Sequence, residues 1–129
     1  MRASVLLVDD NRNFLRVMTY LIKEMGLDPK PAQSAEEGLA ILSSTPVALV
    51  ITDLRMPGIY GMQFLREVGK RRDGVPTVVL TAFDSPELRR QVAESGAVFL
   101  AKSAGREELK RLVLTLLAPP ATNSSISAP

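Results

Sequence analysis

The chain has 129 residues, a length that suits one domain with a sizeable buried core. Its 16 Lys and Arg against 14 Asp and Glu leave a net charge of +2, which does not by itself indicate a nucleic-acid partner. It has neither Cys nor His, which excludes disulfides, thiol nucleophiles and Cys or His metal ligands, so any metal must be a hard ion held by oxygen, such as Mg²⁺ or Ca²⁺.

In the first half of the chain, short apolar runs alternate with segments of helical period. Gly26 is placed to end the first helical segment. Pro29 and Pro31 lie in a weak strand segment and indicate a sheet edge. Ser34 and Glu37 form a capping box, since each side chain reaches a free amide at the start of a helix. The expected elements are a strand at 5–8, a helix at about 14–25, a strand at 28–32 and a helix to about Ser43.

The same alternation continues in the second half. Ser85 can cap a helix with Pro86 at its first position and Glu87 at its positive dipole end, and Gly96 closes that helix. The expected elements are a strand at 47–52, a loop at 57–58, a helix at about 61–72, a strand at 75–80, a helix from about 85, a strand at 97–101 and an amphipathic helix marked by Leu109, Leu112, Val113, Leu116 and Leu117.

Five β-α units in succession predict an α/β fold. Strands that are continuous apolar runs separated by helices indicate a parallel sheet covered on both faces. We expect a flavodoxin-like doubly wound (βα)5 sandwich with strand order 2-1-3-4-5. The domain should span residues 1–117, because residues 118–129 carry no charge and are rich in Pro, Ser and Ala, as in a linker or frayed end.

Polar residues stand at the ends of four expected strands. Asp9 and Asp10 follow the first, Asp53 the third and Lys102 the fifth, while Thr81 ends the fourth. Because ligands bind outside the carboxyl ends of the strands in open α/β sheets, we expect these side chains to meet at one edge. Clustered carboxylates repel one another unless a cation is present, and Mg²⁺ needs only one or two of them.

This set of residues has one coherent use, which is phosphoryl transfer. Asp53 can attack phosphorus as a carboxylate nucleophile and form an acyl phosphate. Mg²⁺ and Lys102 would offset charge on the transferring oxygens, and the Thr81 hydroxyl could donate to one of them. Taken singly, each residue also has a plain structural role: the acids can cap a helix or start a turn, and Lys102 can be a solvated surface charge.

The motifs Val8-Asp9-Asp10, Asp53–Gly58, Thr81-Ala82 and Lys102 resemble the signature of receiver domains of two-component response regulators. The resemblance covers about residues 4–117. It implies that Asp53 is the phosphoacceptor in a phosphorelay, and that the protein is a phosphoprotein whose donor is a histidine kinase or a phosphotransfer protein. The apolar run at 5–8 is too short for a signal peptide, so the expected location is the cytoplasm. A domain of this kind catalyses its own phosphotransfer and dephosphorylation without being an enzyme in the usual sense.

The resemblance also implies roles for the residues around Asp53. Asp10 and Asp53 would ligate Mg²⁺ together with the backbone carbonyl of Arg55, and Asp9 would help to hold the ion. Thr81, the Ala82 amide and Lys102 would contact the phosphoryl group. Thr81 and Phe99 match the family's switch positions, although a lone aromatic residue in a strand is usually part of the core.

Two features bear on how this site would differ from others in the family. The family usually has a cis Pro after the lysine, whereas here Ser103 follows Lys102. A cis bond before Ser costs about 3 kcal/mol, so we expect a trans bond or a strained cis bond. Arg55 and Phe83 occupy positions that tune dephosphorylation in the family, and the bulk of Phe83 leads us to expect a fairly long-lived phosphorylated form.

We therefore expect a phosphorylation-driven switch that changes the face formed by the fourth helix, fifth strand and fifth helix, about residues 85–117. That face would meet an output domain or partner protein, or a second copy in a homodimer. The alternative is a pseudo-receiver, a protein-interaction module that is never phosphorylated. An aspartate phosphohydrolase is disfavoured because Asn11 stands two residues beyond Asp9, and no glycine-rich nucleotide loop follows the first strand. No segment spans a membrane, and none indicates direct nucleic-acid binding.

Overall fold

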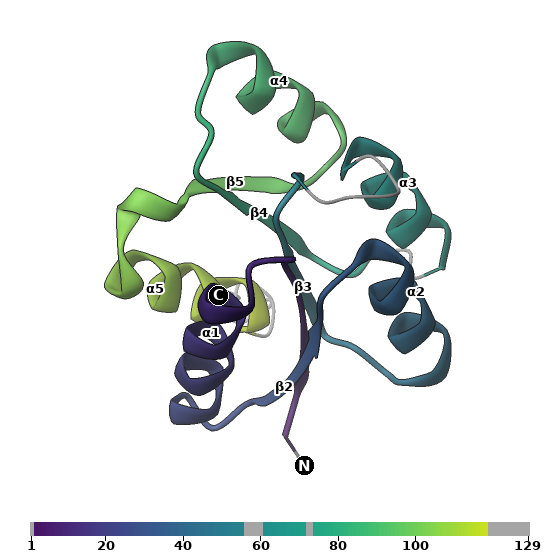
Figure 1. The fold of residues 1–129 in the computed structure, drawn as a ribbon, viewed down its shortest axis with the longest axis vertical. Helices are drawn as coiled ribbons and strands as arrows, with labels where there is room; N and C mark the ends of the chain where they lie inside the picture. The colour runs from purple at the N-terminus through teal and green to yellow at the C-terminus, as the bar shows by residue number, and fades with distance from the viewer. Residues whose placement is uncertain (1, 56–60, 72–73, 119–129) are drawn as a thin grey trace, which may run out of the picture.

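A computed structural model describes residues 2–55, 61–71 and 74–118, and its centre is one five-stranded parallel sheet in the order β2-β1-β3-β4-β5 (Figure 1). The predicted fold class and strand order are therefore confirmed. The strands are β1 (Ser4–Val8), β2 (Asp28–Ala32), β3 (Leu49–Thr52), β4 (Thr77–Thr81) and β5 (Val98–Ala101). The helices are α1 (Arg12–Glu24), α2 (Ala35–Ser44), α3 (Gly61–Arg71), α4 (Pro86–Glu94) and α5 (Arg106–Leu117), with a short 3₁₀ helix η1 (Lys102–Ala104) before α5. The expected loop at 57–58 and, apart from Ala118, the expected tail lie outside the described residues.

The helices cover both faces of the sheet, with α1 and α5 on one face and α2, α3 and α4 on the other (Figure 1). The inner strands β1, β3 and β4 are buried almost throughout, which is why their sequences are continuous apolar runs. On the α1 and α5 side, a core cluster is built from Leu15, Met18, Leu21, Ile22, Leu109 and Val113 with the strands. On the other side, Phe64 and Val68 of α3 pack with α2, while Leu65 packs with Val92 of α4.

The edge strand β2 carries the two prolines that the sequence places there. It pairs with β1 in the register Ser4 to Asp28. The amide of Asp28 donates to the Ala3 carbonyl, so the prolines at alternate positions, Pro29 and Pro31, face the open edge. Because proline has no N–H to offer, this edge is a poor template for another strand.

Side-chain caps determine where several helices begin. The oxygen of Asn11 accepts from the Phe14 amide, so α1 begins at Arg12, two residues before the apolar pattern does. Ser34 and Ser85 cap α2 and α4 in the same way. Helix α5 begins three residues before Leu109. The apolar pattern does not show this first turn, because its residues are polar and exposed.

No helix among the described residues is both long enough and apolar enough to cross a membrane.

Candidate functional site

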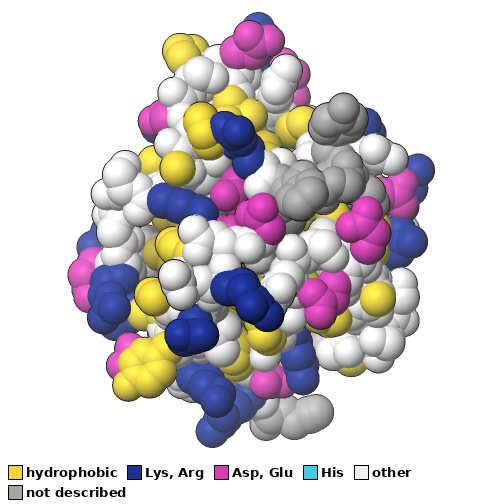
Figure 2. Space-filling model, in the orientation of Figure 1, with side chains coloured by type: hydrophobic (Ala, Val, Ile, Leu, Met, Phe, Trp, Pro, Cys, Tyr) yellow, Lys and Arg dark blue, Asp and Glu magenta, His cyan; other side chains and the backbone are white. Residues whose placement is uncertain are grey.

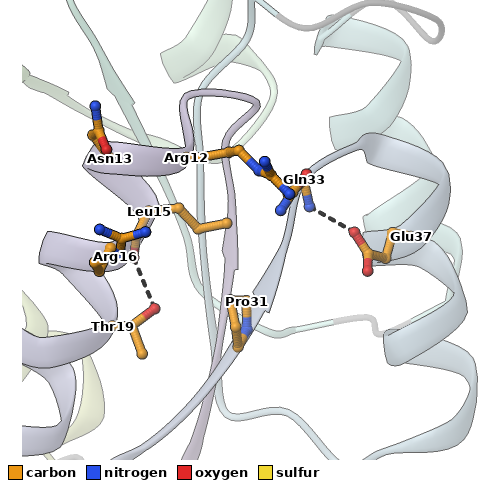
Figure 3. Close-up of a pocket in the computed structure, with 8 residues that line it drawn as sticks. All are labelled: Arg12, Asn13, Leu15, Arg16, Thr19, Pro31, Gln33 and Glu37. Atoms are coloured by element: carbon orange, nitrogen blue, oxygen red, sulfur yellow. Dashed lines mark hydrogen bonds between the residues drawn. The ribbon is translucent and has the colours of Figure 1, made fainter.

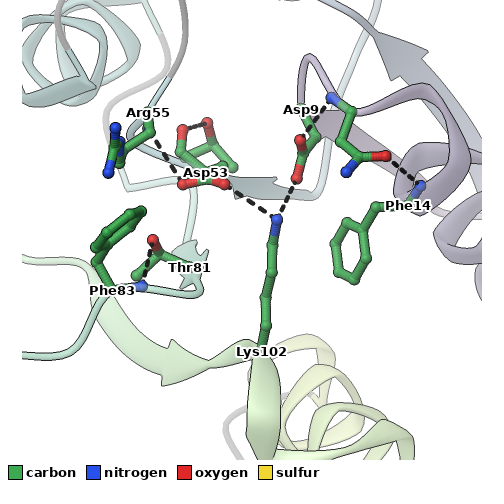
Figure 4. Close-up of polar contacts among 9 residues, drawn as sticks. Asp9, Phe14, Asp53, Arg55, Thr81, Phe83 and Lys102 are labelled. Atoms are coloured by element: carbon green, nitrogen blue, oxygen red, sulfur yellow. Dashed lines mark hydrogen bonds and ion pairs between the residues drawn. The ribbon is translucent and has the colours of Figure 1, made fainter.

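Three side chains from three strand ends meet at the carboxyl edge of the sheet (Figure 4). The ammonium nitrogen of Lys102 lies 2.9 Å from Oδ2 of Asp9 and 3.0 Å from Oδ2 of Asp53. Asp9 follows β1, Asp53 follows β3 and Lys102 follows β5, so residues up to 93 positions apart are joined. Of the five residues expected to meet at this edge, three contact one another: Asp9, Asp53 and Lys102.

These charged groups are largely withdrawn from water. Asp9 is 4% exposed and Asp53 is 8% exposed, and both pair with the Lys102 ammonium. Burial alone lowers the pKa of Lys102, but its hydrogen bonds to Asp9 and Asp53 and their negative charges outweigh that effect. The pKa of Lys102 is therefore raised above its ordinary value, and the ammonium stays charged beside the carboxylates.

The second oxygen of each carboxylate is held by a backbone amide. Oδ1 of Asp9 accepts from the Asn11 amide at 2.9 Å, and Oδ1 of Asp53 accepts from the Arg55 amide at 3.1 Å. Both are short Asp turns in which the side chain bonds the amide two residues on. The turns orient both carboxylates toward Lys102.

Thr81 is fully buried at the end of β4. Its Oγ1 accepts from the Phe83 amide at 3.2 Å, which leaves the hydroxyl proton able to donate elsewhere. Ala82, between them, is exposed. Figure 4 shows Thr81 and Phe83 on the same side of Asp53 as Arg55.

The donor set at this edge fits a hard divalent cation. Two carboxylates converge here, and Mg²⁺ typically takes one or two together with waters and phosphate oxygens. Asp10 follows Asp9 in the chain and is exposed. Within residues 2–55, 61–71 and 74–118, no three or more acidic side chains gather closely enough to hold a metal by themselves. Asp10, Asp53 and the backbone carbonyl of Arg55 would be the ligands of such an ion, with Asp9 helping to hold it.

Two ring contacts at the site have no counterpart in the sequence analysis. The ammonium of Lys102 lies 4.1 Å from the ring centre of Phe14, which the sequence shows only as a helix-face residue. The guanidinium of Arg55 lies 3.9 Å from the ring centre of Phe83. Both distances suit cation–π contacts. The period of apolar residues and the spacing of motifs do not predict such pairs, because each pair joins side chains from separate elements.

Phe99 lies on β5, away from the acids, and is partly buried. It packs against the cluster that contains Leu65, Val79 and Val92, so the expectation that a strand aromatic joins the core agrees with its packing. The guanidinium of Arg89 on α4 lies 4.6 Å from its ring centre. Phe99 therefore contacts α4, the helix that begins soon after Thr81.

The bond between Lys102 and Ser103 is trans, as are the other peptide bonds of the described residues. Lys102 begins the 3₁₀ helix η1, and Gly105, with φ of +90°, connects it to α5. Only glycine adopts this backbone conformation readily. Of the two expected forms of this bond, the trans form is the one present.

Figure 2 shows acidic side chains gathered near the middle of one face, with basic side chains around them. A wider groove of about 740 Å³ lies between α1, the end of β2 and α2 (Figure 3). Two of its polar side chains hydrogen-bond within or beside the helices: Thr19 donates to the Leu15 carbonyl, and Glu37 accepts from the Gln33 amide. The contacts of Lys102 with Asp9 and Asp53 lie at the acidic edge and not in this groove.

Most of the chain matches one known protein family. A model of the response regulator receiver domain family matches residues 5–114. The transcriptional regulatory protein GlrR of Escherichia coli is 34% identical over 112 residues, which cover 86% of this chain and 25% of that protein. The photosynthetic apparatus regulatory protein RegA of Cereibacter sphaeroides is 32% identical over 124 residues, covering 93% of this chain and 67% of that protein. The chain thus spans about a quarter of the length of GlrR.

Solved structures show the same fold. Chemotaxis protein CheY4 of Vibrio cholerae superposes with a TM-score of 0.84 at 26% identity, covering 91% of this chain and all of that one. Response regulator TrrA of Thermotoga maritima, in complex with Mg²⁺-BeF, has a TM-score of 0.80 at 30% identity, covering 89% and 99%. The fold is that of CheY-like receiver domains. The chain belongs to the response regulator receiver domain family, which acts in two-component signalling based on phosphorylation.

Proposed function

We propose that this domain is a switch that takes a phosphoryl group onto Asp53 from a histidine kinase or phosphotransfer protein. The observation that carries the proposal is the pairing of a nearly buried Asp53 carboxylate with the Lys102 ammonium at 3.0 Å. A nucleophile and a fixed positive charge thus lie side by side at the edge where such sheets bind ligands.

The step is an in-line displacement at phosphorus. A carboxylate oxygen of Asp53 forms the new P–O bond while the P–N bond to the donor imidazole breaks, and the donor leaves with its electron pair. Lys102 offsets negative charge on the phosphoryl oxygens. The buried Thr81 hydroxyl has a proton to donate to one of these oxygens, and the Ala82 amide is a second donor nearby in the chain.

The site would use Mg²⁺, which supplies charge neutralisation to the transferring group when it is bound. The carboxylates of Asp9 and Asp53 support this, since both present oxygens at one place. The TrrA structure holds Mg²⁺ with BeF, and that protein aligns along nearly all of its length with this one. The proposed ligands are Asp10, Asp53 and the backbone carbonyl of Arg55, and Asp9 helps to hold the ion.

The output of the switch would be a change in the face of α4, β5 and α5. Thr81 ends β4 and pairs with Ala101 in β5, two residues beyond Phe99, so movement of the Thr81 hydroxyl toward a phosphoryl group would change the packing beside Phe99. A ligand that binds one arrangement better shifts the population toward it. The face would then meet an output domain, a partner protein or a second copy, and the curated relatives are indeed longer than this chain.

The test is the intact mass of the protein after incubation with acetyl phosphate and Mg²⁺. We expect a gain of one phosphoryl group that is absent without Mg²⁺ and absent in Asp53→Asn. Asp28→Asn is the matched control, because Asp28 lies at the opposite edge of the sheet, at the start of β2, and this variant should still be phosphorylated. No gain by wild type while Mg²⁺ binding is demonstrated would favour the pseudo-receiver.

A further inference from the structure

Lys102 is anchored weakly through its own backbone. It is the first residue of η1, which has no side-chain cap, and the next three residues are exposed. The side chain itself is only 19% exposed, so contacts with other elements must hold it in place. Two of these contacts are the carboxylates of Asp9 and Asp53.

The third contact is the ring of Phe14 in the first turn of α1. Its centre lies 4.1 Å from the Lys102 ammonium nitrogen, well within the range of a cation–π contact. Figure 4 shows the ring beside the Lys102 side chain, on the side where Asp9 lies. The ring is itself fixed, because it packs against the core cluster under α1 and α5 and its amide is bound by Asn11.

The ring differs from the carboxylates in one respect that matters for a reaction. When Asp53 forms a bond to phosphorus, its charge and its contact with Lys102 both change. The face of a phenyl ring keeps the same attraction for a cation throughout. Phe14 is thus a contact of Lys102 that does not depend on the chemical state of Asp53.

We propose that Phe14 is a positioning residue that holds the Lys102 ammonium beside Asp53. It touches neither donor nor phosphoryl group and acts through Lys102. The catalytic part of the proposal rests on the proposed function, in which Lys102 offsets charge as the bond to Asp53 forms. A partly buried cation–π contact corresponds to a change of about threefold to tenfold in rate.

The experiment compares Phe14→Leu with Phe14→Tyr. Leu keeps apolar bulk but has no ring, whereas Tyr keeps the ring. Tyr20→Leu is the matched control, because it removes an exposed ring from the same helix away from the site. The first readout is the rate of phosphorylation by acetyl phosphate in Mg²⁺ at saturating donor. We expect Phe14→Leu to be about threefold to tenfold slower, with Phe14→Tyr and Tyr20→Leu near wild type.

A second readout does not need phosphorylation. In metal-free protein, the ring should shift the NMR signals of the Lys102 ε-methylene protons upfield, and this shift should vanish only in Phe14→Leu. A wild-type protein without the shift would overturn the positioning of Lys102. If the protein gains no phosphoryl group, the proposed function fails, but the NMR shift still decides whether the ring holds Lys102.

A double variant separates positioning from general packing. In a Lys102→Ala background, Phe14→Leu should cause no further loss of rate, because the ring has no ammonium left to hold. A further loss equal to that in wild type would show that Phe14 acts on folding or packing alone, and would overturn the proposal.

Discussion

Arg89 of α4 holds its guanidinium 4.6 Å from the ring centre of Phe99 on β5. Two hydrogen bonds to the carboxylate of Asp84, at 2.5 and 2.7 Å, fix the guanidinium in that place. Asp84 lies directly before Ser85, the residue that caps α4. The start of α4 is therefore tied to the Phe99 ring of β5, on the face that we propose changes with phosphorylation.

The Asp84–Arg89 pair should be visible in the titration of Asp84. The hydrogen bond from Arg89 lowers the pKa of Asp84 below its ordinary value, and the same bond raises the pKa of Arg89. A group whose pKa is lowered by folding contributes stability above its unfolded pKa and loses it as the pH falls through the folded pKa. We expect the carboxyl carbon of Asp84, followed by NMR, to titrate below the usual range for Asp.

The control for this titration is Arg89→Gln. Without the guanidinium, the pKa of Asp84 should return toward its ordinary value. An unchanged titration of Asp84 in Arg89→Gln would contradict the pairing. Loss of the pair should also leave the Phe99 ring without its cation, which should change the ring's NMR signals in the same variant.

Sequence alone predicted most of the fold, for a physical reason. Strands buried on both faces must be apolar runs, and helices that pack on a sheet must have an apolar face. Both kinds of element therefore leave a recognisable pattern in the sequence. The predicted boundaries differ from the observed ones mainly at the ends of elements, where the apolar pattern does not fix the terminal residue. Strand β4 begins at Thr77 and not at Val75, because Pro76 lies between them and has no N–H for a sheet ladder.

The candidate site was partly predictable on similar grounds. The carboxyl ends of parallel strands share one edge, so the meeting of Asp9, Asp53 and Lys102 follows from the order of the strands. The contacts that aromatic rings make with Lys102 and Arg55 were not predictable in this way. Such contacts depend on side-chain rotamers from elements far apart in the chain, and no spacing encodes them.

The stack of Arg55 on Phe83 leads to a prediction about the lifetime of the phosphorylated form. The two side chains lie on one side of Asp53 and would obstruct a water molecule approaching it (Figure 4). Phe83→Ala should shorten the lifetime by about twofold to fivefold, the equivalent of an exposed cation–π contact. The measurement is the decay of phosphorylated mass in Mg²⁺ after removal of the donor. Phe83→Tyr should keep the wild-type lifetime, and faster decay in Phe83→Tyr as well would argue against shielding by the ring.

The capping box of α2 should contribute measurably to stability. The Glu37 amide donates to Ser34 Oγ at 3.1 Å, and Glu37 Oε1 accepts from the Gln33 amide at 2.7 Å. Ser34→Ala should lower the free energy of unfolding by about 1 kcal/mol in urea denaturation. Ser34→Asp should recover most of it, since its carboxylate accepts the same bond. Equal losses in Ser34→Ala and Ser34→Asp would show that the cap is not the source of the effect.

Two glycines of α3 should respond in opposite ways to alanine. A Cβ on Gly61 would lie 2.6 Å from the backbone of Leu54, the residue that follows Asp53, whereas a Cβ on Gly69 would meet nothing within 4 Å. Gly69→Ala should stabilise the protein by about 0.5–1 kcal/mol, because alanine has less freedom to lose in a helix.

Gly61→Ala should instead destabilise the protein by about 1–3 kcal/mol, the usual range for overpacking. Because the clash falls on Leu54, it should also move Asp53 relative to Lys102 and slow phosphorylation by acetyl phosphate, while Gly69→Ala leaves the rate unchanged. Urea denaturation and the mass assay measure the two effects separately. A stable Gly61→Ala that is phosphorylated normally would mean that the loop after β3 yields without moving Asp53, and that the close approach of α3 to Leu54 does not position the phosphoacceptor.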